Sequence, residues 1–242
     1  MRALAHAGGH ASVPHRQEAM RSLHAATSLA VLTIVVGAAA ADDVTRATPR
    51  ATTWSFDADQ ANKPPAGFRF GRTGQGKEGR WVVLAVKDAP SGGYVLAQTD
   101  ADQTDYRFPV AVADAPPLAD VAVSVKCKPV SGRVDQGCGM VFRYQDANNY
   151  YLTRANALED NVRLYYVKDG QREQIKSWSG KVKSGVWHDY KVEAKGEHFV
   201  VTFDGKQVLD ATDKTFTQPG KAGVWTKADS VIYFDDLKVE PR

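Results

Sequence analysis

Short runs of β-forming residues, many alternating between apolar and polar side chains, follow one another along the chain from residue 80 onward. Alternation with a period of two is typical of strands that bury one face. It predicts strands at residues 80–86, 94–98, 120–128, 139–145, 149–155, 161–167, 172–178, 187–194, 198–203, 206–211, 221–227 and 231–239. Helical periodicity is not evident. About a dozen short strands at this spacing predict an all-β antiparallel sandwich.

Turn signals set the expected pairing of the strands between residues 139 and 178. Asp169-Gly170 and Asp204-Gly205 each stand between β-formers, the strongest short-range signal for a hairpin. We expect further tight turns at residues 146–149 and 157–160. The expected opposed pairs are Phe142 with Thr153, Arg143 with Leu152, Asn156 with Asn161, Arg154 with Arg163, Tyr165 with Gln174, and Arg163 with Lys176.

This register sorts the side chains of the four strands onto two faces, because neighbours along a strand point to opposite sides. One face is largely apolar and is the expected core face: Met140, Phe142, Tyr144, Tyr151, Thr153, Ala155, Val162, Leu164, Tyr166 and Ile175. We call the opposite side the outer face. It is basic, aromatic and amide-rich, and carboxylates occur only at the turns. A bulge would exchange the two faces beyond it.

The outer face has the chemistry of a glycan-binding surface. Arginine forks hydrogen-bond sugar hydroxyls or carboxylates, and flat aromatic rings cover the C–H faces of sugars. The alternative is an ordinary solvated face whose arginine stems cover apolar surface. The candidate ligand-binding residues are Arg143, Tyr150, Arg154, Asn156, Arg163, Tyr165 and Lys176.

The first 41 residues have the pattern of a secretory signal peptide. An apolar run at 29–40, preceded by Arg21 and ending in three alanines, is too short for a membrane span. Met20 is an alternative start. We expect a flexible leader at 42–53, one domain at 54–242, and a secreted or periplasmic protein. Without residues 1–41, which carry Arg2, Arg16 and Arg21 against Glu18, the formal charge falls from +3 to +1. Nucleic-acid binding therefore gains no support from net charge.

Two cysteines, Cys127 and Cys138, are the only ones in the chain. In an exported protein a disulfide is the expected state, and two buried free thiols are the alternative. Cys127 shares parity with Val121, Val123 and Val125, and Cys138 shares parity with Met140 and Phe142. Both sulfur atoms are therefore expected on the core side, where a bond between two strands is geometrically plausible.

Other motifs have a structural explanation beside a functional one. Gly74-Gln-Gly-Lys-Glu-Gly79 matches a dinucleotide fingerprint, but a strand follows where the fingerprint needs a helix, so we expect a loop. Asp146 and Asn148 are candidate calcium ligands, although both residues also favour turns. For His188 we expect a partly buried structural role, and for Asp235-Asp236 a hydrogen-bonded one.

Three segments, 135–171, 186–213 and 220–239, resemble the concanavalin A-like lectin/glucanase superfamily. Within it, the chain is similar to secreted bacterial laminin-G-like and 3-keto-disaccharide hydrolase-like domains. The resemblance rests on Gly139 to Arg143, Trp187-His188, Phe203-Asp204-Gly205 and Phe234-Asp235-Asp236-Leu237. It implies a two-sheet jelly roll whose concave sheet often holds sugar, and calcium is common among its members.

The resemblance leaves the activity open, because this fold carries lectins, glycosidases, lyases and adhesion modules. Laminarinase-like members carry two catalytic glutamates on one strand, and no strand here has alternating carboxylates. A retaining glycosidase needs two carboxyls about 5 Å apart, which distant residues could still supply. We therefore expect a monomeric domain that binds a glycan, anionic glycans included, without nucleic acid or a membrane span. A glycoside hydrolase is the first alternative, and an envelope structural or protein-interaction domain is the second.

Overall fold

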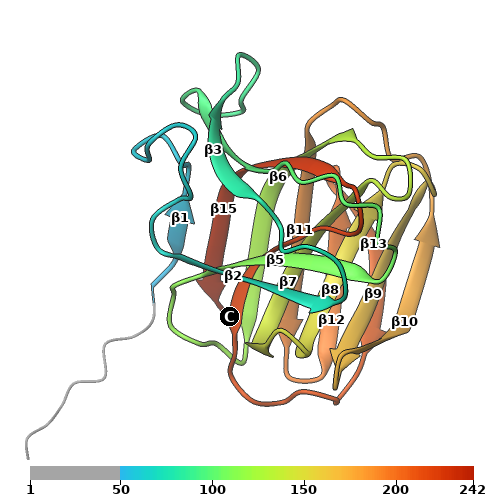
Figure 1. Ribbon diagram of the computed structural model, residues 1–242. Coiled ribbons are helices and arrows are strands. Elements are labelled where there is room, and N and C mark those ends of the chain that lie inside the picture. Colours follow the sequence, from blue (N-terminus) through green and yellow to red (C-terminus); the bar gives the residue numbers. More distant parts are fainter. Residues whose placement is uncertain (1–49) are drawn as a thin grey trace, which may run out of the picture. The chain divides into compact units, whose positions relative to one another are not determined.

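The computed structural model describes residues 50–242, which form strands and turns only (Figure 1). The predicted signal peptide and most of the predicted leader lie outside these residues. No helix in the described range is long and apolar enough to cross a bilayer. The strands are β1 (Thr52–Trp54), β2 (Phe68–Gly74), β3 (Trp81–Ala85), β4 (Tyr94–Gln98), β5 (Arg107–Ala113), β6 (Val121–Ser131), β7 (Gly137–Asp146), β8 (Asn149–Asn156), β9 (Asn161–Lys168), β10 (Gln171–Ser179), β11 (His188–Lys195), β12 (His198–Phe203), β13 (Lys206–Thr212), β14 (Lys221–Trp225) and β15 (Val231–Pro241).

These strands form two antiparallel sheets, which confirms the predicted sandwich. One sheet has the order β13-β12-β11-β6-β15-β4-β3, with β1 also paired to β15, and the other has the order β10-β9-β8-β7-β14-β5-β2. The main core lies between the sheets, where alternate valines of β6 and alternate residues of β11 share one apolar cluster with Met140, Phe142 and Tyr151 of the seven-stranded sheet. All twelve strands predicted from residue 80 onward are present.

The disulfide is formed as predicted, between two fully buried cysteines. Cys127 lies on β6 and Cys138 on β7, so the bond joins the two sheets through the core. Near the same end, the ring of His188 stacks on Phe203 and its Nδ1 atom lies 2.8 Å from the Asp204 carboxylate. His188 and the Phe203-Asp204-Gly205 motif are therefore one structural contact between β11 and the β12–β13 turn, while the Trp187 ring lies beneath Lys128.

Strand β5 was not predicted, and it changes the outer face of the seven-stranded sheet. All seven of its residues are buried, so it has no alternation, and Pro109 lies inside it. With β2 it crosses in front of β7, β8 and β9 (Figure 1). Contacts confirm that the sheet rolls over on itself. The Thr73 hydroxyl lies 2.7 Å from the Tyr150 hydroxyl, and Tyr106 before β5 donates to the Gly170 carbonyl in the β9–β10 turn.

A second apolar cluster fills the space under β5 and β2. It consists of Phe108, Val110, Val112, Val141, Tyr150, Leu152, Tyr165, Val167 and Trp225, with Tyr106 and Tyr144 packed against it. The middle of the outer face is therefore an interior, and the alternative of an ordinary solvated face does not hold there. Gly139 makes this packing possible, because a Cβ there would lie 2.7 Å from the Trp225 ring.

The predicted register holds in part. Asn156–Asn161, Arg154–Arg163 and Tyr165–Gln174 are opposed as predicted. Phe142 pairs with Tyr151 rather than Thr153, because a bulge lies between Phe142 and Asp146. A second bulge between Gln174 and Lys176 places Ser177, not Lys176, opposite Arg163. Tyr144, predicted in the core, packs in the second cluster instead.

Candidate functional site

Two of the seven predicted ligand-binding residues do not lie on the outer face, and in each case a bulge is the reason. Arg143 has a positive φ of 46° at the first bulge, which turns its side chain to the core side. There the guanidinium group donates to the carbonyls of Ala119, Phe216 and Gly196 and lies over the Phe199 ring. It is buried, and its contacts make it an anchor for three loops.

Lys176 leaves the outer face at the second bulge. Its Nζ atom donates to the carbonyl of Asp210 on β13, a strand of the opposite sheet. Trp178, two residues later, packs against the main core beneath Lys206. Tyr150 does lie on the outer face, but it is fully buried in the second apolar cluster. Arg143 and Tyr150 are therefore buried away from solvent, and Lys176, although exposed, lies apart from the other predicted residues.

The remaining four predicted residues come together at one end of the outer face. Here Arg154 and Asn156 of β8 meet Arg163 and Tyr165 of β9. They are joined by Asn161 at the start of β9 and by one residue from each of three loops. We call the whole group the polar cluster: Asp135, Arg154, Asn156, Glu159, Asn161, Arg163, Tyr165 and Lys227.

Hydrogen bonds fix the buried half of the polar cluster. Arg154 donates to Asn161 Oδ1 at 2.7 Å, to Glu159 Oε2 at 2.8 Å and to the Tyr165 hydroxyl at 3.2 Å. The Asn156 carboxamide donates to Asp135 Oδ1 and to Glu159 Oε1. These hydrogen bonds hold the geometry of the buried groups before any ligand arrives, although the Nε atom of Arg154 has no hydrogen-bond partner in the described part of the chain.

The β8–β9 turn positions Glu159. The Oδ1 atom of Asn156 accepts hydrogen bonds from the backbone N–H groups of Leu158 and Glu159, which is an Asx turn. This turn folds Glu159 back over the end of β8, where its carboxylate also lies 3.3 Å from Arg163. Glu159 and Arg163 are thus the part of the polar cluster that solvent reaches, with side chains 39% and 33% exposed.

Two further loops bring Asp135 and Lys227 to the polar cluster. The Asp229 carboxylate accepts hydrogen bonds from the backbone N–H groups of Arg133, Val134 and Asp135, which holds the β6–β7 loop. The Asp135 carboxylate lies 3.3 Å from Lys227 Nζ, and Lys227 also pairs with Asp105. Neither Asp135 nor Lys227 was predicted, because their loops are far from β8 and β9 in sequence.

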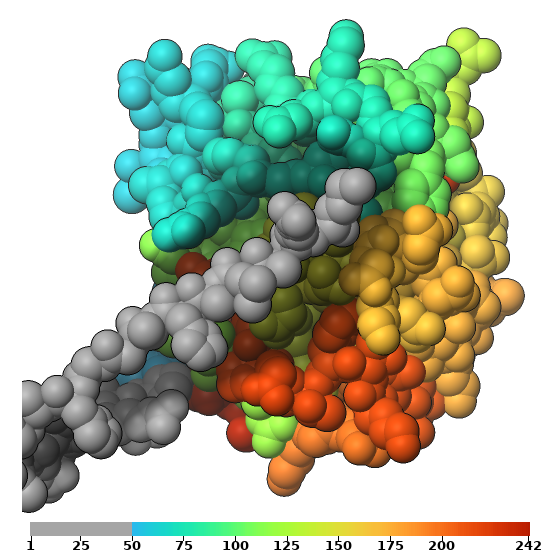
Figure 2. All heavy atoms as spheres, turned by 60° about the horizontal axis from the view of Figure 1, so that its bottom comes forward, coloured from blue at the N-terminus to red at the C-terminus, as the bar shows by residue number. Residues whose placement is uncertain are grey.

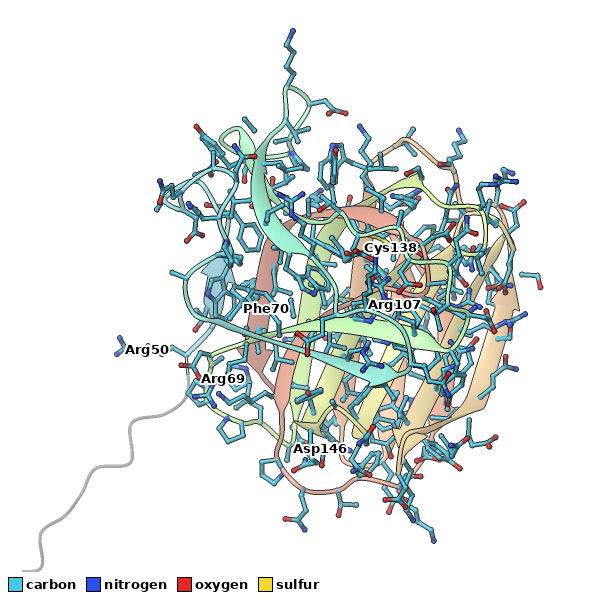
Figure 3. All side chains as sticks on the ribbon, in the orientation of Figure 1. Arg50, Arg69, Phe70, Arg107, Cys138 and Asp146 are labelled. Carbon is cyan, nitrogen blue, oxygen red and sulfur yellow. A yellow bond between two sulfur atoms is a disulfide. The ribbon has the colours of Figure 1, made fainter. Side chains whose placement is uncertain are left out.

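Buried Arg107 holds the neighbouring loops in place. Its guanidinium group donates to the carbonyls of Lys77, Glu78 and Ala228 and to the Asp100 carboxylate. Figure 3 shows Arg107 on β5, above the strands that carry the polar cluster. The glycine-rich segment at 74–79 is therefore a loop anchored by an arginine, and β3 follows it, as predicted.

The two carboxylates of the polar cluster are pushed in opposite directions. Burial raises the pKa of Asp135, although the charges of Arg154 and Lys227 act against that rise. Burial would also raise the pKa of Glu159, but hydrogen bonding by Asn161 and the charges of Arg154 and Arg163 outweigh it, so the pKa is lowered. Paired carboxyls with opposed shifts are the arrangement of acid and base catalysts.

The same two carboxylates lie close together. One amide nitrogen, Nδ2 of Asn156, lies 3.0 Å from an Asp135 oxygen and 3.2 Å from a Glu159 oxygen. These oxygens are therefore within about 6 Å of each other, near the separation of the carboxyl pair in retaining glycosidases. Carboxylates that the sequence places 24 positions apart thus converge, although no strand carries an alternating pair.

The candidate calcium ligands Asp146 and Asn148 lie in a hydrogen-bonded turn. The Asp146 carboxylate accepts hydrogen bonds from the Asn148 backbone N–H and from the Asn149 side chain, as in an ordinary turn. Figure 3 shows Asp146 at the end of its strand, away from Arg107. Within residues 50–242 no three His, Cys, Asp or Glu side chains gather as a metal site. Asp235 and Asp236 both bond Ser91, which is the structural role expected for them.

A family model described as a 3-keto-alpha-glucoside-1,2-lyase-like domain matches residues 74–240, more than half of the chain. Among curated proteins, a levanase of Bacillus subtilis (strain 168) is 29% identical over 109 residues, which are 43% of this chain. The match spans only 16% of that levanase.

Solved structures share the fold at low sequence identity. The carbohydrate-binding module CBM66 from Bacillus subtilis superposes with a TM-score of 0.57 at 21% identity, covering 75% of this chain and 98% of the module. A Bacillus licheniformis β-glucanase superposes with a TM-score of 0.54 at 12% sequence identity, covering 81% of this chain and 100% of the glucanase. Domain 4 of the arabinanase AbnA from Geobacillus stearothermophilus, in complex with arabinotriose, superposes with a TM-score of 0.51 at 14% sequence identity. The superposition covers 79% of this chain and 93% of that domain. These likenesses confirm the concanavalin A-like jelly roll.

Proposed function

The chain belongs to the family of 3-keto-alpha-glucoside-1,2-lyase-like domains, and from this premise we propose that it is a secreted, monomeric domain that binds a glycan at the polar cluster. Glu159 and Arg163 offer a carboxylate and a guanidinium group to solvent, side by side. Such a pair can accept and donate hydrogen bonds to neighbouring hydroxyls of one sugar ring. The buried partners behind them keep both groups in place, which favours binding by limiting the entropy lost.

The relatives support a saccharide as the ligand. The chain resembles part of a levanase, and the structures that share its fold include a carbohydrate-binding module and a domain in complex with arabinotriose. The single observation that carries the proposal is the polar cluster itself. Its charged and amide groups are hydrogen-bonded to one another, and they lie at one end of the outer face, whose middle is filled by the second apolar cluster.

Anionic glycans are included in this proposal, because positive charge exceeds negative charge around Tyr165. Arg154 and Arg163 both pair with the carboxylate of Glu159, and Arg154 also feels the charge of the buried Asp135 carboxylate. Together with Arg172, three arginine charges therefore face two carboxylates. Arg172 lies between the rings of Phe108 and Tyr165, 4.7 Å from each centroid, and within residues 50–242 it has no ion-pair partner. A uronate or sulfate group would supply the missing charge.

Binding is tested on a glycan array and then by calorimetry on the strongest ligand. Arg163→Ala is expected to weaken binding about tenfold, the order of one charge-assisted hydrogen bond. The matched control is Lys191→Ala on the opposite sheet, where the Lys191–Glu193 pair has nearly the same length and exposure. Equal affinity for the wild type and Arg163→Ala would refute the site. Binding that weakens steeply with added salt indicates an anionic ligand.

A second candidate function is cleavage of the glycosidic bond, which the converging carboxylates of Asp135 and Glu159 favour. In a 3-keto-α-glucoside the ketone acidifies the proton on C2. Glu159 would take that proton, C1 and C2 would form a double bond, and the C1–O bond would break. Arg163 would stabilise the enolate oxygen, and the leaving oxygen would take a proton from the Asp135–Lys227 pair. The elimination needs no oxidant or water.

Turnover is tested with a p-nitrophenyl 3-keto-α-glucoside, whose cleavage releases a coloured product. The wild type is expected to release it, and Glu159→Gln is expected to lose the activity by at least a hundredfold, as removal of a general base does. Lys191→Ala should keep full activity. If the wild type releases nothing while it still binds glycans, the chain is a binding domain without this chemistry.

A further inference from the structure

Phe70 is an exposed aromatic residue on an edge of the sandwich. It lies on β2, the last strand of the seven-stranded sheet, and is 40% exposed. The other exposed large apolar residues of the described range are aliphatic: Val134, Leu158 and Val186. A single exposed apolar side chain needs no explanation. The surroundings of Phe70, however, are those of a built site.

The ring of Phe70 is held in one orientation. It stacks on the buried Trp81 ring with an interplanar angle of 14° and a centroid distance of 6.5 Å. Trp81 lies on β3, the edge strand of the opposite sheet, so the stack joins the edges of the two sheets. One face of Phe70 is thereby supported, and an aromatic platform with a fixed ring loses little entropy when a ligand stacks on it.

A hollow lies on each side of Phe70. One, of about 510 Å³, is lined by Arg69, Phe70, Tyr144, Gln145 and Gly220, among others. The other, of about 370 Å³, is lined by Asn62, Phe70, Glu78, Arg80 and Trp81, among others. In Figure 2 the first is the hollow between the overhanging teal residues and the orange residues before β14. We call the two hollows together the Phe70 cleft.

The wall of the larger hollow depends on the bulge at Arg143. The positive φ of Arg143 turns Tyr144 outward into the cleft, and the Arg143 side chain anchors the loops that carry Ala119 and Phe216. Gly220 lets its loop lie against this bulge, because a Cβ there would be 2.3 Å from the Arg143 carbonyl carbon. A backbone strained by about 1–3 kcal/mol is kept only where packing over-determines it.

The lining of the cleft suits a sugar chain. Phe70 and Tyr144 offer aromatic surface, while Arg69 on one side and Asn62 and Arg80 on the other offer hydrogen-bond donors. The Gln145 amide nitrogen already donates to the carbonyls of Arg143 and Pro219, so Gln145 offers its Oε1 atom as an acceptor. Sugars combine apolar C–H faces with a rim of hydroxyls, which is the complement of this pattern. We propose that the Phe70 cleft is a second saccharide-binding site, which takes an extended oligosaccharide with one ring over Phe70.

This site is separate from the polar cluster. The polar cluster lies where β7 begins, near Gly137, and the larger hollow of the cleft lies where β7 ends, at Tyr144. Seven residues at about 3.3 Å each place this hollow on the order of 20 Å from the polar cluster. In Figure 3 Arg69 and Phe70 lie together, well away from Arg107. A long polysaccharide could occupy both sites, and the second contact would then form at high effective concentration.

The test measures binding of levan, linear arabinan and a soluble β-glucan by affinity electrophoresis, and then by calorimetry. Phe70→Ala is expected to weaken binding of at least one polymer about fivefold to tenfold, the order of one aromatic stacking contact. Phe70→Tyr should restore it. Val186→Ala, at an equally exposed valine outside both sites, should have no effect.

The variants separate this inference from the proposed function. If Phe70→Ala weakens binding and Arg163→Ala does not, the cleft stands and the polar cluster is not the glycan site. If Arg163→Ala weakens binding and Phe70→Ala has the wild-type affinity for all three polymers, the cleft is refuted and the proposed function stands. Binding of an extended peptide but no polymer also overturns the saccharide assignment. Unchanged thermal unfolding of Phe70→Ala shows that any loss comes from the surface.

Discussion

Replacement of Arg143 separates structural from ligand-binding arginines on the seven-stranded sheet. Its guanidinium group donates to three carbonyl oxygens at 2.7, 3.0 and 2.5 Å and is almost fully buried. Arg143→Ala would leave those carbonyls unpaired and open a cavity beside Phe199. Hydrogen bonds to charged groups are worth about 1.5–3 kcal/mol each and are not additive, so we expect a loss of about 4 kcal/mol.

This loss is large against the about 5–15 kcal/mol that stabilises a typical domain. For a chain of this size, about 4 kcal/mol corresponds to a fall in Tm of about 8–16 °C. Arg163→Ala removes only an exposed ion pair, worth about 0–1 kcal/mol, and should leave Tm nearly unchanged. Arg143→Lys keeps the positive charge but loses the planar guanidinium group that reaches several carbonyls, so its Tm should lie between those of the wild type and Arg143→Ala.

The assay is thermal unfolding followed by near-ultraviolet circular dichroism, with the affinity for a short glycan measured well below Tm. Arg143→Ala should lose stability and keep its affinity for the short glycan at the polar cluster. Arg163→Ala should keep its stability and lose affinity for the short glycan. An Arg143→Ala variant within about 1 kcal/mol of the wild type would contradict its role as a loop anchor. An Arg143→Ala variant that keeps its fold but loses affinity for the short glycan would contradict that role as well.

Three further predictions concern the scaffold and its pH dependence. Replacing Cys127 and Cys138 by alanine, which opens a loop of separation 11, should cost about 3 kcal/mol in urea unfolding, and no change in midpoint would contradict it. Gly139→Ala should cost about 2 kcal/mol by forcing the Trp225 ring aside, seen as an altered tryptophan emission spectrum. Burial raises the pKa of Asp235 to about 6, from an ordinary value of 3.8. Between these two pH values the folded state binds more protons at Asp235 than the unfolded state does. The free energy of unfolding therefore falls as the pH rises from about 4 to about 6. Asp235→Asn should therefore gain stability relative to the wild type over that range, and a constant difference would refute it.

The fold was predictable because period-two patterns and turn residues are local signals. All strands from residue 80 onward except β5 follow from them, as do the hairpin at Asp169-Gly170 and the core parity of the cysteines. Strand β5 escaped prediction because a fully buried strand does not alternate and Pro109 argues against one. Omitting β5 made the outer face look open, although β5 and β2 cover its middle.

The site was predictable only where the register is regular. The pairing of β8 with β9 brings Arg154, Asn156, Arg163 and Tyr165 together without a bulge. The bulges near Arg143 and at 174–176 each add residues to one strand, and composition gives no sign of them. The contributions of Asp135 and Lys227 depend on tertiary contacts between loops, which no local pattern encodes.

A crystal structure of the domain with a bound oligosaccharide tests the central claim most directly. We predict one sugar ring at the polar cluster, with hydroxyl oxygens within hydrogen-bond distance of Glu159 and Arg163. A longer chain should show a second ordered segment over Phe70. A glycan held only elsewhere, for example on the eight-stranded sheet beside Lys126 and Lys191, would contradict it.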